Sequence, residues 1–173
     1  MGHRPSIRGS YWKEFKMIWS EPTNFELSQI INGSKNIAVV GASNDTSKAS
    51  FFVMTYLVGS TNYKLFPINP KEENILGIKV YKSLKEVPEA IDVCVVFRRP
   101  DALDAVLDEV LEVGAKVLWM QLGIRNDAVA ELGTSSGIKV VQDRCIKIEH
   151  ARFHGGLHLA GFDTGVISSK RLK

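Results

Sequence analysis

The sequence predicts an α/β fold in which an open parallel sheet of about five strands carries helices on both faces. One observation is that short apolar runs recur along the chain, near residues 36–40, 63–68, 92–97, 116–120 and 138–141. A second is that segments with helical periodicity or helix-capping residues separate most of these runs. A third is that the first run is continuously apolar rather than alternating, which is typical of a parallel strand buried on both faces. Alternating strands and helices favour one doubly covered sheet.

The N-terminal residues 1–22 are expected to form a helical extension to a domain that spans residues 23–173. Tyr11, Phe15, Ile18 and Trp19 would share one face of a helix that Ser10 could cap. This apolar face suits packing against the domain or against a partner subunit, as in a homodimer. A helix that binds a membrane or a protein partner is the alternative.

The domain itself is expected to begin with a short helix, because Thr23 and Glu26 have the spacing of a capping box. Later helices are expected over residues 48–58 and 101–113, and over 127–135 with Asn126 as N-cap. The stretch that follows residue 71 is expected to be irregular. Within residues 101–113 an inward apolar stripe has helical spacing: Leu103, Val106, Leu107, Val110 and Leu111.

The composition is that of a soluble globular protein. The chain has 173 residues, of which 45% are hydrophobic and 24% charged, and its net charge of +3 is too small to indicate a nucleic-acid partner. Two cysteines do not make a disulfide framework. No apolar run reaches membrane-spanning length, and the N-terminus has no signal-peptide core. A cytoplasmic protein without a membrane partner is therefore expected.

A ligand site is expected where the strands end, because open parallel sheets bind ligands outside the carboxyl ends of their strands. Gly41 would let the chain turn tightly, and free amides of the next helix would face an anion together with Ser43 and Ser47. Cations also recur near these ends. The candidate residues are Gly41, Ala42, Ser43, Asn44, Ser47, Lys48, Asn69, Pro70, Lys71, Arg98, Arg99, Gln121, Leu122 and Gly123.

The loop after the first strand lacks the pattern of dinucleotide enzymes. Ser43 and Thr46 stand where the second and third glycines of a GxGxxG fingerprint would be. The second strand is followed by Asn69 and Lys71 rather than by the acid that binds the ribose of NAD. Nearby cations favour a nucleotide with an extra ribose phosphate, which includes both NADP and coenzyme A.

The order of motifs resembles the small stand-alone CoA-binding proteins, relatives of the CoA-binding domain of the succinyl-CoA synthetase α subunit. The strings that carry the resemblance are IAVVGASND, FPINPKEENILGIKVYKSL, VCVVFRRPDAL, AKVLWMQLGIRN and DRCIKIEHAR. The resemblance implies a Rossmann-like domain that holds CoA. Residues 41–43 would meet the phosphates and residues 69–71 the nucleotide end; Phe97, Arg98 and Arg99 would line the nucleotide, and residues 121–123 the pantetheine side. The family usually has proline where Thr46 stands and a basic residue about two positions further on, and Lys48 could serve as that residue.

Cys145 is a further candidate, because it follows the last strand. A helix start and its neighbours Arg144 and Lys147 would favour its thiolate form, and near the pantetheine thiol it could form a mixed disulfide with CoA. A half-buried structural cysteine is the alternative. His150, His154 and His158 recur every four residues, but Gly155 and Gly156 interrupt that pattern, so no metal site is expected.

The sequence thus favours a protein that binds CoA or an acyl-CoA without turnover of its own. The chain has no room for the second domain of the ligase α subunit, and no catalytic triad or carboxylate pair stands out at the strand ends. An NADP-dependent or thiol-redox enzyme that uses the same cleft is the alternative. A third hypothesis is an interaction module that recruits a protein partner through Trp12 and Trp19.

Overall fold

A five-stranded parallel sheet forms the centre of the molecule in the computed structural model, which describes residues 18–155. The strands are ordered β2-β1-β5-β6-β7, and every neighbouring pair is parallel. Their bounds are β1 (Asn36–Val40), β2 (Lys64–Ile68), β5 (Val93–Val96), β6 (Val117–Met120) and β7 (Lys139–Val141). The α/β class and the five-stranded parallel sheet are confirmed.

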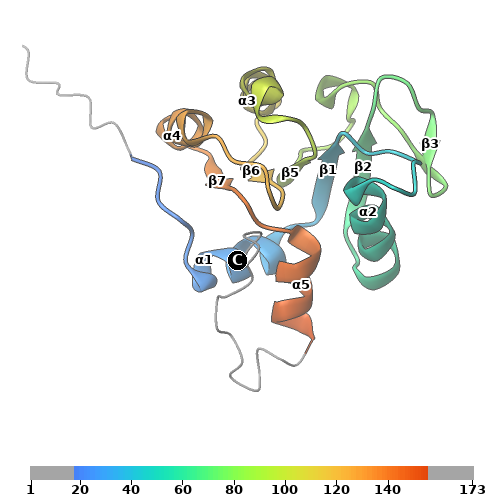
Figure 1. Ribbon diagram of the computed structural model, residues 1–173, viewed down its shortest axis with the longest axis horizontal. Helices are drawn as coiled ribbons and strands as arrows, with labels where there is room; N and C mark the ends of the chain where they lie inside the picture. The colour runs from blue at the N-terminus through green and yellow to red at the C-terminus, as the bar shows by residue number, and fades with distance from the viewer. Residues whose placement is uncertain (1–17, 156–173) are drawn as a thin grey trace, which may run out of the picture.

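Helices cover both faces of this sheet (Figure 1). On one face lie α1 (Asn24–Gly33), α2 (Ala49–Ser60) and α5 (Ile146–His154), and on the other lie α3 (Leu103–Glu112) and α4 (Asp127–Ser135). Alternate side chains of each strand point to opposite faces. In β1, Ile37 and Val39 join the core beneath α1, α2 and α5, whereas Ala38 and Val40 join the core beneath α3 and α4. The strands are therefore apolar on both faces.

The predicted helix starts are found where local capping specifies them. The Thr23 hydroxyl accepts a hydrogen bond from Glu26 N, and the Glu26 carboxylate accepts one from Thr23 N, which completes the capping box of α1. The Asn126 side chain accepts a hydrogen bond from Val129 N at the start of α4. The helix predicted over residues 101–113 begins later, at Leu103, because residues 101 and 102 belong to a 3-10 turn, η2 (Pro100–Ala102).

The stretch expected to be irregular contains a small hairpin, formed by β3 (Asn74–Ile75) and β4 (Ile78–Lys79). Leu76 and Gly77 make its turn, with φ angles of 51° and 77°. Two consecutive positive φ angles are typical of a type I′ hairpin turn, for which Asn-Gly or Asp-Gly is the usual signal. A leucine in the first position hides that signal, and strands of two residues are too short to show an alternation. The 3-10 turn η1 (Leu84–Glu86) follows before β5.

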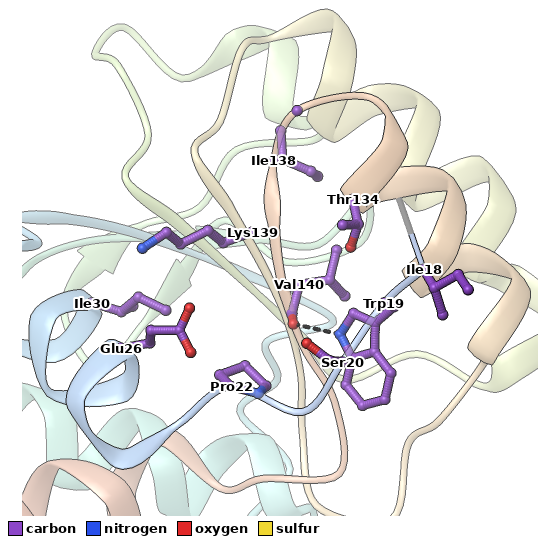
Figure 2. A pocket seen from close by; sticks show the side chains of 11 residues that line it. Ile18, Trp19, Ser20, Pro22, Glu26, Ile30, Thr134, Ile138, Lys139 and Val140 are labelled. Carbon is purple, nitrogen blue, oxygen red and sulfur yellow. Dashed lines mark hydrogen bonds between the residues drawn. The ribbon is translucent and has the colours of Figure 1, made fainter. Parts of the chain in front are cut away.

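The segment before α1 is not helical where the structure describes it. Residues 18–23 have no helical structure, so the predicted helix does not extend to Ile18 and Trp19, and Tyr11 and Phe15 lie outside the described residues. The Trp19 indole Nε1 instead donates a hydrogen bond to the Val140 carbonyl, at 2.8 Å, on the edge strand β7 (Figure 2). The Trp19 ring also faces the Arg125 guanidinium at 5.3 Å. Side-chain anchoring to the edge of the sheet thus overrides the helical periodicity.

The division into an extension of residues 1–22 and a domain of residues 23–173 stays a prediction. Among the helices of residues 18–155, none combines the length and the apolar character that crossing a membrane requires.

Candidate functional site

The strand order places a switch point between β1 and β5. From β1 the chain moves outward to β2, and the remaining strands continue on the other side of β1. Counted in chain order, the five strands of this sheet are arranged 2-1-3-4-5. This order leaves a crevice at the carboxyl ends of β1 and β5, where such sheets bind their ligands. A cleft of about 780 Å³ lies there, lined by residues that follow β1, β5 and β6 and by the first turns of α2 and α5.

Gly41 packs closely against the backbone at the end of β5. Its φ is +84°, and a Cβ at this position would lie 2.6 Å from the Phe97 carbonyl oxygen. The Gly41 amide donates to the Ile68 carbonyl at 3.1 Å, and the Phe97 amide donates to the Val40 carbonyl at 2.9 Å. The loop after β1 therefore crosses directly against the end of β5, which only glycine permits.

The start of α2 offers backbone donors to the cleft. Its N-cap is Lys48, in an extended conformation, and no side chain caps the helix. Ala49 and Ser50 follow and line the cleft with Lys48. The first amides of a helix have no partner within the helix and carry the positive end of its dipole, so this N-terminus suits an anion.

Four cationic side chains line the same cleft. Arg99 pairs with Asp101 at 3.1 Å. Within residues 18–155, Lys48, Arg98 and Lys147 form no ion pair with a carboxylate. A cleft with this excess of positive charge favours a polyanionic ligand.

Several residues of the predicted site hold the surrounding loops together instead of lining the cleft. Asn44 N donates to the Glu72 carboxylate at 3.0 Å, and Asn44 Nδ2 donates to the Asn74 carbonyl at 2.6 Å. Ser47 donates from its amide and hydroxyl to Asp45 Oδ1, which lowers the pKa of Asp45. Asn44 and Ser47 therefore fix the loop that leads into α2.

The residues after β2 are divided between two cavities. Asn69 lines the main cleft, and its Nδ2 donates to the Ala42 carbonyl at 2.7 Å, while Ala42 itself is buried. Pro70 lines a neighbouring cavity of about 320 Å³, to which Arg98 also contributes. Lys71 is exposed and lines neither cavity; its amide donates to Asn69 Oδ1 at 2.8 Å.

The far end of the cleft is formed by β6 and the start of α5. Gln121 is 3% exposed; its Oε1 accepts a hydrogen bond from Ile146 N at 3.4 Å, and its Nε2 has no partner among the described residues. Cys145 is half-buried, serves as the N-cap of α5 and lines the cleft. Leu122 lines the cleft as well, whereas Gly123 N donates to Asp143 Oδ1 outside it, at 2.7 Å.

The Arg144 side chain interacts with carboxylates rather than with the neighbouring Cys145. Its guanidinium pairs with Glu21 at 2.7 Å and with Glu149 at 3.2 Å. Lys147, the other cation expected near Cys145, does line the cleft.

Ten of the predicted residues line the cleft: Gly41, Ser43, Lys48, Asn69, Phe97, Arg98, Arg99, Gln121, Leu122 and Cys145. Its apolar lining was largely missed. Phe52, Val53, Ile124 and Ile148 complete the walls, and the Phe52 side chain is 58% exposed there. The adjacent aromatic residues Phe51 and Phe52, near the start of α2, were the available signal. Their helix is apolar on most of its surface, so periodicity did not distinguish a cleft wall from the core.

Two further cavities lie away from these strand ends. One, of about 230 Å³, lies between the segment before α1 and β7, with Glu26 and Lys139 beside it (Figure 2). The other, of about 540 Å³, is lined by His150, His154 and residues at the starts of β1 and β2. Among residues 18–155, no group of three or more His, Cys, Asp or Glu side chains is arranged to hold a metal ion; His158 lies outside that range.

The chain is similar to a known protein family and to known proteins in sequence and structure. The family model described as "CoA binding domain" matches residues 35–151. Protein YneT of Bacillus subtilis is 38% identical over 130 residues, which cover 75% of this chain and 96% of YneT. A solved structure of a hypothetical protein from Pyrococcus horikoshii superposes with a TM-score of 0.73 at 32% identity, over 76% of this chain and 92% of that one.

A longer relative contains a similar region. Subunit alpha of ADP-forming acetate–CoA ligase II from Pyrococcus furiosus is 29% identical over 124 residues, which cover 66% of this chain but only 27% of the ligase subunit. The similarity is thus to one part of that enzyme.

Proposed function

The chain belongs to the family of CoA binding domains, and we propose that it binds coenzyme A in the cleft at the carboxyl ends of β1, β5 and β6. The resemblance predicted from the sequence motifs is confirmed at the level of the family. The ligand itself is the proposal. The observation that carries it is the combination of an uncapped helix N-terminus with three cations unpaired in the described part of the chain, in the cleft of a CoA-binding fold.

The cleft combines the kinds of lining that CoA requires, cationic side chains together with polar and apolar ones. CoA has a polyanionic end, with a diphosphate and a ribose phosphate, and a long pantetheine arm that carries amides and a thiol. Lys48, Arg98 and the start of α2 would bind the diphosphate and the ribose phosphate. The arm would be held by Gln121 Nε2, which has no partner among the described residues, and by the apolar Leu122 and Ile148. Asn44, Ser47, Lys71 and Gly123 have no direct role in this proposal, because they do not line the cleft.

The family match favours CoA over NADP. Both ligands carry a ribose phosphate, but only CoA has a pantetheine arm. Binding of an acyl-CoA is compatible with the same cleft. The reaction of the acetate–CoA ligase is not part of the proposal, because the matched region covers 27% of that enzyme's subunit.

The test is calorimetric titration of the ligand-stripped protein with CoA, 3′-dephospho-CoA and NADP. We expect CoA to bind, and to bind at least about tenfold more tightly than 3′-dephospho-CoA, because a charge-assisted contact to phosphate is worth about 1.5–3 kcal/mol. In Arg98→Ala this difference should shrink, whereas Lys85→Ala removes the same charge from a residue that does not line the cleft and should keep it. Binding of NADP without CoA, or of none of the three, would refute the proposal.

A further inference from the structure

The Cys145 thiol belongs to the part of the cleft that the end of β6 and the start of α5 form. It is half-buried and lines the cleft, and the chain's other cysteine, Cys94, is fully buried in β5. Lys147, in the first turn of α5, lines the cleft as well. Cys145 is thus the one thiol of this chain that a ligand in the cleft can reach.

Gln121 gives independent support for a ligand group at this point. Its side chain is 97% buried, and its Oε1 already accepts a hydrogen bond from Ile146 N, next to Cys145. Its Nε2 is buried with no partner within residues 18–155. An unsatisfied buried amide costs about 1–3 kcal/mol. A ligand carbonyl beside Cys145, such as an amide of the pantetheine arm, would supply the missing acceptor.

The length of the pantetheine arm is sufficient to span the distance between the ends of β1 and β6. The anion-binding start of α2 follows β1, and Gln121 follows β6, two strands away in the order β2-β1-β5-β6-β7. Two strand spacings amount to about 10 Å. The pantetheine arm is as long as about four extended residues, or roughly 14 Å. A CoA whose diphosphate lies at α2 therefore carries its sulfur to the region of Cys145.

We propose that Cys145 exchanges with CoA disulfide and retains CoA as a mixed disulfide, a step that rests on the proposed CoA binding. The Cys145 thiolate attacks one sulfur of CoA disulfide; the bond between the two CoA sulfurs breaks, and a bond between Cys145 Sγ and one CoA sulfur forms. The second CoA leaves as a thiolate and takes up the proton that Cys145 releases. CoA disulfide is the oxidant, so no other electron acceptor is needed. The protein then acts as a covalent, reducible carrier of CoA.

The test treats the reduced, ligand-stripped protein with CoA disulfide and follows its intact mass. We expect a gain of one CoA less two hydrogen atoms, reversal by dithiothreitol, and an adduct that peptide mapping places on Cys145. The adduct should form at least about tenfold faster than with glutathione disulfide at equal concentration. Adenosine 3′,5′-bisphosphate, which carries no thiol, should slow the reaction with CoA disulfide by competing for the cleft.

Two variants make the assignment specific. Cys145→Ser should lose the adduct, with a thermal unfolding curve as the check that it folds. Cys94→Ala should retain the adduct, because Cys94 is fully buried and its burial raises the pKa of its thiol.

The outcomes separate the two proposals. If calorimetry shows CoA binding but no adduct forms on Cys145, the disulfide proposal is wrong and the binding proposal stands. If neither binding nor adduct is seen, both are wrong. Equal rates with CoA disulfide and glutathione disulfide would mean that Cys145 is only an accessible thiol, and would also refute the disulfide proposal.

Discussion

Gly41 is a position of the cleft at which both the backbone angle and the surrounding space require glycine. Its positive φ and the 2.6 Å approach of a hypothetical Cβ to the Phe97 carbonyl are separate constraints. The first costs any other residue about 1–3 kcal/mol. The second requires the end of β5 to move, and this end carries Phe97 and Arg98 into the cleft.

Gly41→Ala should therefore lower the free energy of unfolding by more than about 1–3 kcal/mol and weaken CoA binding. Urea unfolding and calorimetric titration measure the two effects. Gly137→Ala is the matched control, because Gly137 has a φ of +90° but open space around its Cβ position and lies outside the cleft. Equal destabilisation by the two changes would contradict the steric role of Gly41.

His150 is a buried titratable residue of α5. It is 8% exposed, and its Nδ1 lies 3.0 Å from the Tyr56 hydroxyl, while the His154 ring stacks on it at 4.1 Å. Burial first, and then His154, lower the pKa of His150 below its ordinary value of 6.5. Neutral His150 is therefore the form that the folded protein favours.

The pH dependence of stability follows from this pKa. As the pH falls, His150 becomes protonated in the unfolded chain at a higher pH than in the folded protein. The contribution of neutral His150 to the free energy of unfolding is therefore complete above pH 6.5 and is lost between pH 6.5 and the lower pKa of His150 in the folded protein. In His150→Gln the melting temperature should fall less between about pH 7 and 5, because the titrating group is absent. Each kcal/mol of pH-dependent stability removed in this way should reduce the fall by about 2–4 °C. His154→Gln removes the second histidine and should leave a larger slope than His150→Gln. An unchanged slope in His150→Gln would contradict this role.

At the scale of elements, α5 is held by buried ion pairs. Glu149 is 3% exposed and pairs with Arg152 and with Arg144, which in turn pairs with Glu21 before α1. Arg152 also donates to Asn24 Oδ1 at 2.9 Å. This network connects α5, which carries Cys145 and Lys147, to the beginning of α1.

Glu149→Gln should destabilise the protein by about 3–5 kcal/mol, because it removes the buried carboxylate that Arg144 and Arg152 share. Denaturant unfolding measures the loss, and Glu73→Gln, at an exposed carboxylate, is the control with the same change in charge. Because α5 forms one wall of the cleft, CoA affinity should also fall in Glu149→Gln. A loss below about 1 kcal/mol would mean that the network contributes little.

At the scale of the whole molecule, the strand order brings distant segments into one cleft. Residues after β1, β5 and β6 and the start of α5 lie far apart in the sequence but end at the same edge of the sheet. Parallel connections make this arrangement unavoidable, because every strand points its carboxyl end in the same direction. The position of this cleft at the carboxyl ends of the strands could therefore be predicted from the order of strands and helices in the sequence.

Predictions succeeded where the relevant physics is local. The capping box at Thr23, the N-cap at Asn126 and the apolar strand of β1 depend on residues a few positions apart, and their elements were located to within about two residues. The prediction of a helix through Trp19 failed because the partners of Trp19 are Val140 and Arg125, more than a hundred positions away. Periodicity carries no information about such partners.

For the candidate site, the sequence alone determined its edge of the sheet, its glycine turn and its cationic character. These follow from the strand–loop–helix order and from the charges of residues next to strand ends. Only the tertiary structure decided which of those residues line the cleft: it ties Asn44 to Glu72, pairs Arg144 with Glu21 and Glu149, and leaves the amide of Gln121 free beside Cys145. The physical reason is that a side chain's hydrogen-bond and charge partners come from segments that approach one another only when the chain folds.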